Sequence, residues 1–262
     1  DNNSKDSARS TGKFNEGAIF NGSSSVIDLG SPLLGQTHSV SLWFNADSIT
    51  TDTEGDILFA QYTSGVTGRY IVSIYTNTMR IFVGGSTIQT ISATWTANAW
   101  THFVIVKNSS GYEAFVNGSS IGTSSLTSNI DTASNTTIGA GRVASPFKVF
   151  PGSIDQVRVY NTALDSTDVS NLYAETVSDT STLSFPSGKT AIATYQLDGN
   201  STDLSGNYNG TDTNVAYAYD GAETNIEYRF GKFGQAAVFN GSSSYITSNS
   251  LPSIGTGDFT FS

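Results

Sequence analysis

The acidic side chains of this 262-residue chain are scattered in a way that argues against hydrolytic catalysis. Two carboxylates about 5 to 9 Å apart could act as acid and as nucleophile or base on a glycosidic bond, and on a strand they would appear as a Glu-x-Asp-x-Glu pattern. The glutamates instead stand singly or in a polar loop: Glu16, Glu54, Glu113, Glu175, Glu223 and Glu227. Because the chain has no cysteine and only two histidines, it has few residues from which a nucleophilic triad of the usual kinds could be built. The sequence predicts that the protein is not an enzyme.

Aromatic rings offer a second kind of chemistry, because they can stack on sugar rings while amides and carboxylates bind the hydroxyl groups. The better candidates lie in or beside loops and strand ends: Tyr62, Tyr70, Tyr75, Trp95 and Tyr112. The alternative for each of them is packing in the core, which is the commoner role of an aromatic residue in a β-sandwich. We therefore expect ligand-binding residues among Tyr62, Tyr70, Trp95 and Tyr112.

The charge of the chain limits its partners. With 22 acidic and 12 basic residues the net charge is -10, and no local basic patch is visible in the sequence. Such a surface repels nucleic acid and anionic membranes, although its carboxylates favour weak binding of divalent cations. No apolar run reaches the roughly 18 residues that a membrane span requires. We expect neither nucleic-acid binding nor membrane insertion.

Hydrophobic residues alternate along several segments with the period of a β-strand. In residues 38–45, for example, Val40, Leu42 and Phe44 fall on one face, and polar residues and Trp43 on the other. The same pattern recurs in three further segments: 69–75, 102–107 and 153–160. Turn-forming Gly and Asn residues separate these segments, which is typical of an all-β sandwich or barrel.

One short helix is expected directly after the last of these strands. Asp165 can cap its first turn, with Asp168 three residues later as in a capping box. Val169, Leu172 and Tyr173 then form a single apolar stripe.

The chain repeats itself across a polar linker. The nine residues AIFNGSSSV from Ala18 return as AVFNGSSSY from Ala237, 219 positions later. A repeat at a fixed offset indicates tandem copies of one domain. We expect a first copy at residues 1–174, a linker at 175–190, and the N-terminal part of a second copy at 191–262, as a window on a longer array.

Four motifs in this order resemble the laminin-G-like domains of the concanavalin A-like lectin/glucanase superfamily: GAIFNGSSSVIDL, HSVSLWFN, NAWTHFVIVKNSSGYEAFVNGSSIG and FPGSIDQVRVYNTALDSTDVSNLY. The resemblance covers most of residues 12–174 and resumes from 192. It implies a jelly-roll sandwich of two antiparallel sheets. It does not fix a ligand, because function depends on sites placed on a fold.

The resemblance also implies a structural calcium ion, because related domains often hold one near the strand that contains Asp155. Calcium takes six to eight oxygen ligands, and the loop from Leu197 to Asn207 adds Asp198 and Asp203. The alternative is a partly buried Asp155 whose carboxylate is satisfied by backbone N–H groups or by Arg158.

Two functions remain open. The first is a non-catalytic repeat unit of an extracellular, cell-surface or virion-surface protein, in which tandem lectin-like sandwiches build a fibre, stalk or coat and contact neighbouring copies. The alternative is a carbohydrate-binding module appended to a secreted enzyme, with surface glycans as its partners.

The first copy lacks the opening strand of the family, whose equivalent occurs once, at Ala191 to Leu197. The linker could return this strand to the first copy, because 16 extended residues reach about 50 Å. Otherwise the strand begins a second sandwich. The sequence favours the second outcome, because residues 191–262 keep the family order.

Overall fold

The structure is a computed structural model that divides into two compact units, Asp1–Asp220 and Gly221–Ser262. It describes the following residues: 12–48, 55–62, 68–76, 78–83, 87–130, 133–143, 145–176, 182–198, 200–214, 216–217, 227–230 and 235–238. Within the second unit, β16 (Glu227–Phe230) pairs antiparallel with β17 (Gln235–Val238). The rest of the expected second copy beyond Val238 lies outside the described residues.

The first unit is a sandwich of two antiparallel sheets, as predicted. The eight-stranded sheet has the following order: β10 (Ser119–Ser124), β9 (Gly111–Val116), β8 (Thr101–Asn108), β3 (His38–Ala46), β12 (Pro151–Tyr160), β1 (Ala18–Asn21) and β15 (Ala216–Tyr217), with β13 (Ala193–Tyr195) also paired to β12. The seven-stranded sheet has this order: β14 (Thr211–Thr213), β2 (Val26–Asp28), β11 (Thr136–Ile138), β4 (Asp56–Gln61), β5 (Tyr70–Tyr75), β6 (Thr78–Val83) and β7 (Thr87–Ser92).

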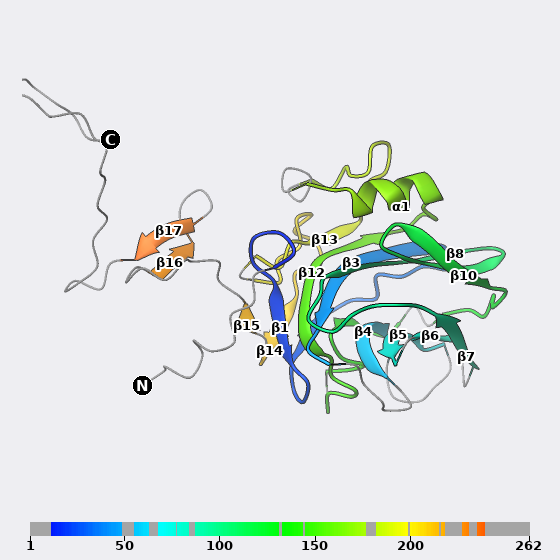
Figure 1. Ribbon diagram of the computed structural model, residues 1–262, viewed down its shortest axis with the longest axis horizontal. Coiled ribbons are helices and arrows are strands. Elements are labelled where there is room, and N and C mark those ends of the chain that lie inside the picture. The colour runs from blue at the N-terminus through cyan, green and yellow to red at the C-terminus, as the bar shows by residue number, and fades with distance from the viewer. Residues whose placement is uncertain are drawn as a thin grey trace, which may run out of the picture. The chain divides into compact units, whose positions relative to one another are not determined.

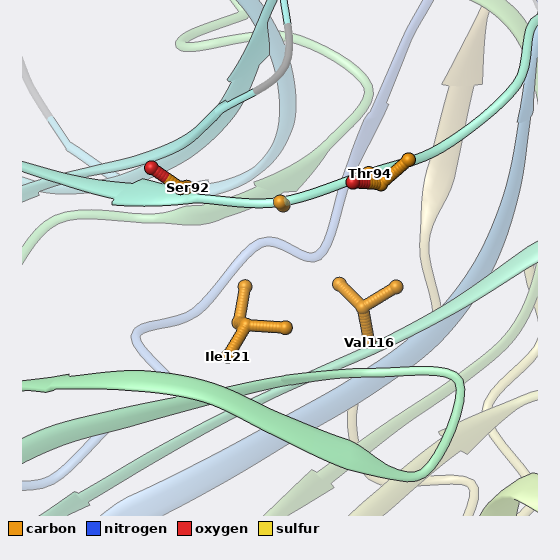
Figure 2. A pocket seen from close by; sticks show the side chains of 5 residues that line it. Ser92, Thr94, Val116 and Ile121 are labelled. Atoms are coloured by element: carbon orange, nitrogen blue, oxygen red, sulfur yellow. The ribbon is translucent and has the colours of Figure 1, made fainter.

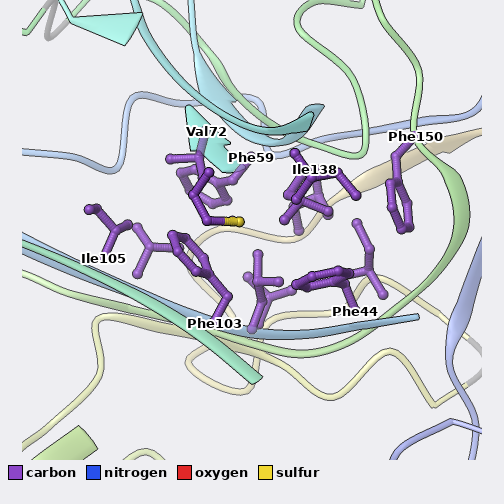
Figure 3. Packing of buried hydrophobic residues seen from close by; sticks show 14 of the residues in the cluster. Phe44, Phe59, Val72, Phe103, Ile105, Ile138 and Phe150 are labelled. Atoms are coloured by element: carbon purple, nitrogen blue, oxygen red, sulfur yellow. The ribbon is translucent and has the colours of Figure 1, made fainter. Parts of the chain in front are cut away.

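The main core lies between the two sheets and follows the alternation of the strands. Phe44 and Phe103 of the eight-stranded sheet face Phe59, Val72 and Ile138 of the seven-stranded sheet (Figure 3). All five are at most 1% exposed, so the period-two pattern identified the buried face correctly.

The predicted helix is α1 (Ser166–Tyr173), and it covers the outer face of the eight-stranded sheet (Figure 1). Asp165 caps it, and Asp165 and Asp168 form the expected capping box. Val169 and Leu172 pack in a second apolar cluster with Val104 of β8. Among the described residues, no helix has the length and apolar character needed to cross a membrane.

Residues of the family motifs, together with Glu175 just after the last motif, lie between this sheet and α1. Glu175 accepts a hydrogen bond from the Trp43 indole N–H at 3.1 Å and forms an ion pair with Arg158. Tyr173 stacks on Trp43, with ring centroids 5.7 Å apart, and His102 lies against the same indole at 4.9 Å. These motif residues therefore hold the helix on the sheet.

The strand at residues 193–195 completes the sandwich of the same chain. Tyr195, Thr194 and Ala193 of β13 pair with Val157, Arg158 and Val159 of β12. β1 covers the first half of β12, from Pro151 to Ile154, and β13 covers the part that β1 leaves open. The preference for a separate second sandwich is thus wrong for this strand, because β12 is longer than β1 and its remaining edge needs a partner.

The segment after β13 closes the same end of both sheets. β14 pairs with β2, and β15 pairs with β1. Tyr195 is fully buried in the main core, and its hydroxyl donates to the Tyr208 carbonyl at 2.7 Å. Residues 191–217 therefore belong to the same compact unit as residues 12–176.

Candidate functional site

Three of the four aromatic residues predicted to bind a ligand lie in the core. The exposed fractions of Tyr70, Trp95 and Tyr112 are 0%, 6% and 2%, and all three pack in the cluster between the sheets. In this conformation none of them offers a ring face to a sugar. Tyr62 and Tyr75 differ, because both are half-buried and lie on the outer side of the seven-stranded sheet.

The strand register defines which side chains share that outer side. Ser73 of β5 is paired with Arg80 of β6, and Ile71 is paired with Phe82. Val72, the neighbour of both β5 residues, points into the main core, so Ile71 and Ser73 point outward. Their partners Arg80 and Phe82 share this face.

Arginine and aromatic side chains stack on each other across this face. The guanidinium carbon of Arg80 lies 3.7 Å from the centroid of the Tyr75 ring. Arg69, immediately before β5, lies 5.2 Å from the Phe82 ring. Both distances lie within the roughly 6 Å at which a cation is attracted to the face of an aromatic ring.

The loop between β11 and β12 adds further groups at the β4 side of the face. Phe147 packs against the apolar cluster that contains Ile57, and the Ile57 N–H donates to the Lys148 carbonyl at 2.9 Å. Arg142 lies 5.3 Å from the Phe147 ring and donates from Nε to the Ser145 carbonyl at 3.0 Å. The loop is thereby fixed beside β4.

We call the following set the outer face: Tyr62, Arg69, Tyr75, Arg80, Phe82, Arg142, Phe147 and Lys148. It holds four of the twelve Lys and Arg residues of an acidic chain. The acidic residues on the strands of this sheet are Asp56, at the start of β4, Asp28, on β2, and Asp212, on β14. The outer face therefore concentrates positive charge beside partly exposed rings.

Two of the three predicted metal ligands come together at the other end of the sandwich. Asp155 is fully buried, and its carboxylate accepts the N–H groups of Phe14 at 2.9 Å and Gln156 at 2.7 Å. Burial raises the pKa of Asp155 well above its usual value, and the neighbouring charge of Asp198 raises it further. Burial also raises the pKa of Asp198, which accepts the Glu16 N–H at 3.1 Å.

Asp203 has a separate, structural role. Its carboxylate accepts the N–H groups of Thr194 at 2.8 Å, Ser205 at 3.2 Å and Tyr208 at 3.3 Å, and so ties its loop to β13. Within the described part of the chain, no group of three or more His, Cys, Asp or Glu side chains is placed to hold a metal.

The surroundings of Asp155 and Asp198 nevertheless fit an oxygen-binding cation. Gln156 follows Asp155 in a bulge of β12, and its buried Oε1 has no hydrogen-bond partner. Its Nε2 donates to the Gln196 carbonyl at 3.2 Å, two residues before Asp198. Two like-charged carboxyls with raised pKa values and an unsatisfied amide oxygen are the kind of ligands that calcium takes.

A cleft of about 550 Å³ opens where β7 faces the β9–β10 hairpin (Figure 2). Ser92 and Thr94 line one side, and Val116 and Ile121 approach from the other. These side chains are aliphatic or carry a hydroxyl, so the cleft has neither the rings nor the charges of the outer face.

Comparison with known proteins identifies the family of this fold. A laminin-G-type family model described as "Concanavalin A-like lectin/glucanases superfamily" matches residues 21–170. The chain belongs to this superfamily. A search of curated proteins found no match.

Several solved structures share the fold at low sequence identity. Domain 4 of an extracellular arabinanase from Geobacillus stearothermophilus, in complex with arabinotriose, has a TM-score of 0.51 and 20% identity over 63% of this chain and 80% of that one. A putative carbohydrate binding protein from Bacteroides ovatus has a TM-score of 0.57 and 16% identity, over 79% of this chain and 60% of that one. The CBM40 of a Ruminococcus gnavus IT-sialidase, bound to α2,3-sialyllactose, has a TM-score of 0.50 and 14% identity, over 60% of this chain and 95% of that one.

Proposed function

We propose that this protein is a non-catalytic, extracellular carbohydrate-binding module, and that it binds glycans on the outer face of the seven-stranded sheet. The observation that carries the proposal is the combination of partly exposed rings and stacked arginines on that face. Tyr62, Tyr75 and Phe147 are half-buried, so each leaves part of its ring to solvent. Rings stack on the apolar faces of sugars, and guanidinium groups donate hydrogen bonds to their oxygens.

The structural relatives support this assignment. The arabinanase domain and the sialidase CBM40 were each solved with an oligosaccharide, and each is named as a part of an enzyme, in the first case an extracellular one. Two of the described glutamates make structural contacts, in line with a non-catalytic role. Glu175 is buried in its ion pair with Arg158, and Glu113 accepts a hydrogen bond from Ser120 on the other sheet.

A glycan array with ring-removal variants tests the proposal. The wild-type chain should bind a subset of glycans, and Tyr75→Ala and Tyr62→Ala should each weaken that binding about ten-fold or more. Ile121→Ala, at the cleft and outside the outer face, is the matched control and should bind as wild type does. A wild-type protein with no glycan binding above background would contradict the proposal.

We also propose a structural calcium ion bound by Asp155 and Asp198, with Gln156 Oε1 as a further oxygen ligand. A cation there would offset the burial that raises the pKa of both carboxyls, and the repulsion by Asp198 that raises the pKa of Asp155 further. Calcium at about a hundred-fold excess over its Kd would stabilise the fold by about 2.7 kcal/mol. A chelator should therefore lower the melting temperature, and Asp155→Asn should remove that sensitivity. An unchanged wild-type melting curve in chelator would rule the calcium out.

A second candidate function is a repeat unit in an extracellular, cell-surface or virion-surface array, favoured by the repeat at an offset of 219 residues. In such an array neighbouring copies would be partners. β13 indicates how they could connect, because a segment that precedes the second repeat completes the sandwich that contains the first. The complete gene tests this idea: further copies at the same spacing would support it, and a gene without them would refute it.

A further inference from the structure

We propose that a cation bound between Asp155 and Asp198 keeps residues 191–217, which we call the closing segment, docked on the sandwich. This inference rests on the proposed calcium site, because it assumes that the two carboxylates bind a cation. It goes further by naming the part of the chain that the cation holds. When the cation is removed, the closing segment should open while the rest of the sandwich stays folded.

The closing segment is attached to the sandwich by short strands. β13 pairs with β12 over three residues, β14 with β2 over three, and β15 with β1 over two. By contrast, β3 and β8 pair over seven residues inside the eight-stranded sheet. β14 and β15 are also the outermost strands of their sheets. Because short edge strands open at a lower free-energy cost than central ones, the closing segment can detach while the central strands stay paired.

The proposed cation site joins the closing segment to the strand on which it docks. Asp198 belongs to the closing segment, three residues after β13, and Asp155 belongs to β12. Asp198 also accepts the Glu16 N–H at 3.1 Å and the Asn15 side-chain amide at 3.2 Å. Opening the segment separates the two carboxylates, so a cation that needs both of them binds only the docked state. By linkage, such a cation stabilises the docked state.

Without a cation, the same two carboxylates oppose docking. The groups that donate hydrogen bonds to them in the described part of the chain are backbone and side-chain amides, which carry no net charge. Neither carboxylate forms an ion pair with a described cation. The charge of Asp198 raises the pKa of Asp155, so the two carboxyls repel each other when the segment is docked.

Gln156 adds a second link between β12 and the closing segment. Its Nε2 donates to the Gln196 carbonyl at 3.2 Å, and its buried Oε1 has no hydrogen-bond partner. An unpaired buried oxygen costs free energy, and a cation beside it would recover that cost. The orphan oxygen is thus carried by a side chain that already holds the closing segment.

Hydrogen exchange of the full 262-residue chain, read by mass spectrometry with calcium and with a chelator, tests the inference. Calcium at about ten times its Kd makes the open segment about ten-fold rarer, and exchange rates follow the population of the open state. Removing calcium should therefore speed exchange about ten-fold in peptides from 191–197 and 200–213, while peptides from β5 and β6 stay equally protected.

Two variants locate the effect. Asp198→Asn removes one of the two charges and should give the same exchange with and without calcium. Glu113→Gln, which removes a carboxylate on β9, is the matched control and should respond to calcium as the wild type does.

Calcium binding, measured by calorimetry on the same protein, separates the two claims. If no calcium binds, the proposed calcium site fails and this inference fails with it. If calcium binds but the chelator leaves exchange in the closing segment unchanged, or speeds it equally in β5 and β6, only this inference is overturned. A calcium response that persists in Asp198→Asn also overturns it. If Asp198→Asn does not fold, as judged by circular dichroism, Asp155→Asn provides the same comparison.

Discussion

Lowering the pH from 7 to 5 should cost the fold about 2 kcal/mol through His102 alone. His102 is 1% exposed, and its Nε2 lies 2.9 Å from the Ser41 hydroxyl oxygen. Burial, together with the nearby charges of Arg158 and Lys13, lowers the pKa of His102 to about 3. The folded protein therefore keeps this imidazole neutral over the whole range in which the unfolded chain takes up a proton.

The sign and size of this loss of stability follow from the pKa values of His102 in the folded and unfolded states. The pKa of His102 is about 3 when folded and 6.5 when unfolded, so its contribution is complete above pH 6.5 and is lost as the pH falls toward 3. At pH 5, which is about 1.5 units below the unfolded pKa, protonation of the imidazole stabilises the unfolded state. At about 1.36 kcal/mol per unit this amounts to about 2 kcal/mol. His38, whose pKa burial lowers to about 4, adds a similar loss. Asp155 acts in the opposite direction, because its raised pKa makes protonation stabilise the fold.

Comparing the wild type with a His102 variant at two pH values isolates the contribution of His102 to the pH dependence of stability. Urea unfolding of the wild type and of His102→Gln at pH 7 and pH 5 gives four unfolding free energies. Glutamine does not titrate, so the variant should show about 2 kcal/mol less pH dependence than the wild type, while every other titrating group cancels. His38→Gln should show a similar reduction. An equal pH dependence in the wild type and in both glutamine variants would refute the argument.

Three further predictions concern stability, each checked by chemical denaturation. Glu175→Gln leaves the guanidinium of Arg158 buried without its anion and should destabilise the fold by about 3 to 5 kcal/mol; a loss below about 1 kcal/mol would show that this ion pair contributes little. Gly111 has φ +132° and its added Cβ would collide with the Ser124 carbonyl, so Gly111→Ala should destabilise the β8–β9 turn, whereas Gly30→Ala, with open space around it, should cost less. Asp165→Ala removes the N-cap of α1 and should cost about 1 kcal/mol, and Asp165→Asn should restore most of it.

Most of the fold could be predicted because its signals are local. The alternation in residues 38–45 identifies β3 and its buried face, and Asp165 with Asp168 marks the start of α1. The partner of β13 could not be predicted in this way. Residues 191–197 look like a strand in either location, and the choice depends on which strand edge remains open.

The candidate site was harder to predict, for two physical reasons. Tyr70 and Tyr75 lie on the same strand at an odd separation, so they point to opposite sides of the sheet. The alternation of Tyr70 with Val72 and Ile74 could have identified it as a core residue. The four cations of the outer face had no such signal, because positions 69, 80, 142 and 148 come together only through strand pairing and the packing of the loop after β11.

The central claim is that the outer face binds the glycan, and backbone amide shifts measured by NMR during a glycan titration test it most directly. With a glycan that the array identifies, the shifts should change at Tyr62, Arg69, Tyr75 and Arg80 and in the loop around Phe147. Shift changes confined to the cleft around Thr94 and Ile121, or to the loop around Asp198, would contradict the account.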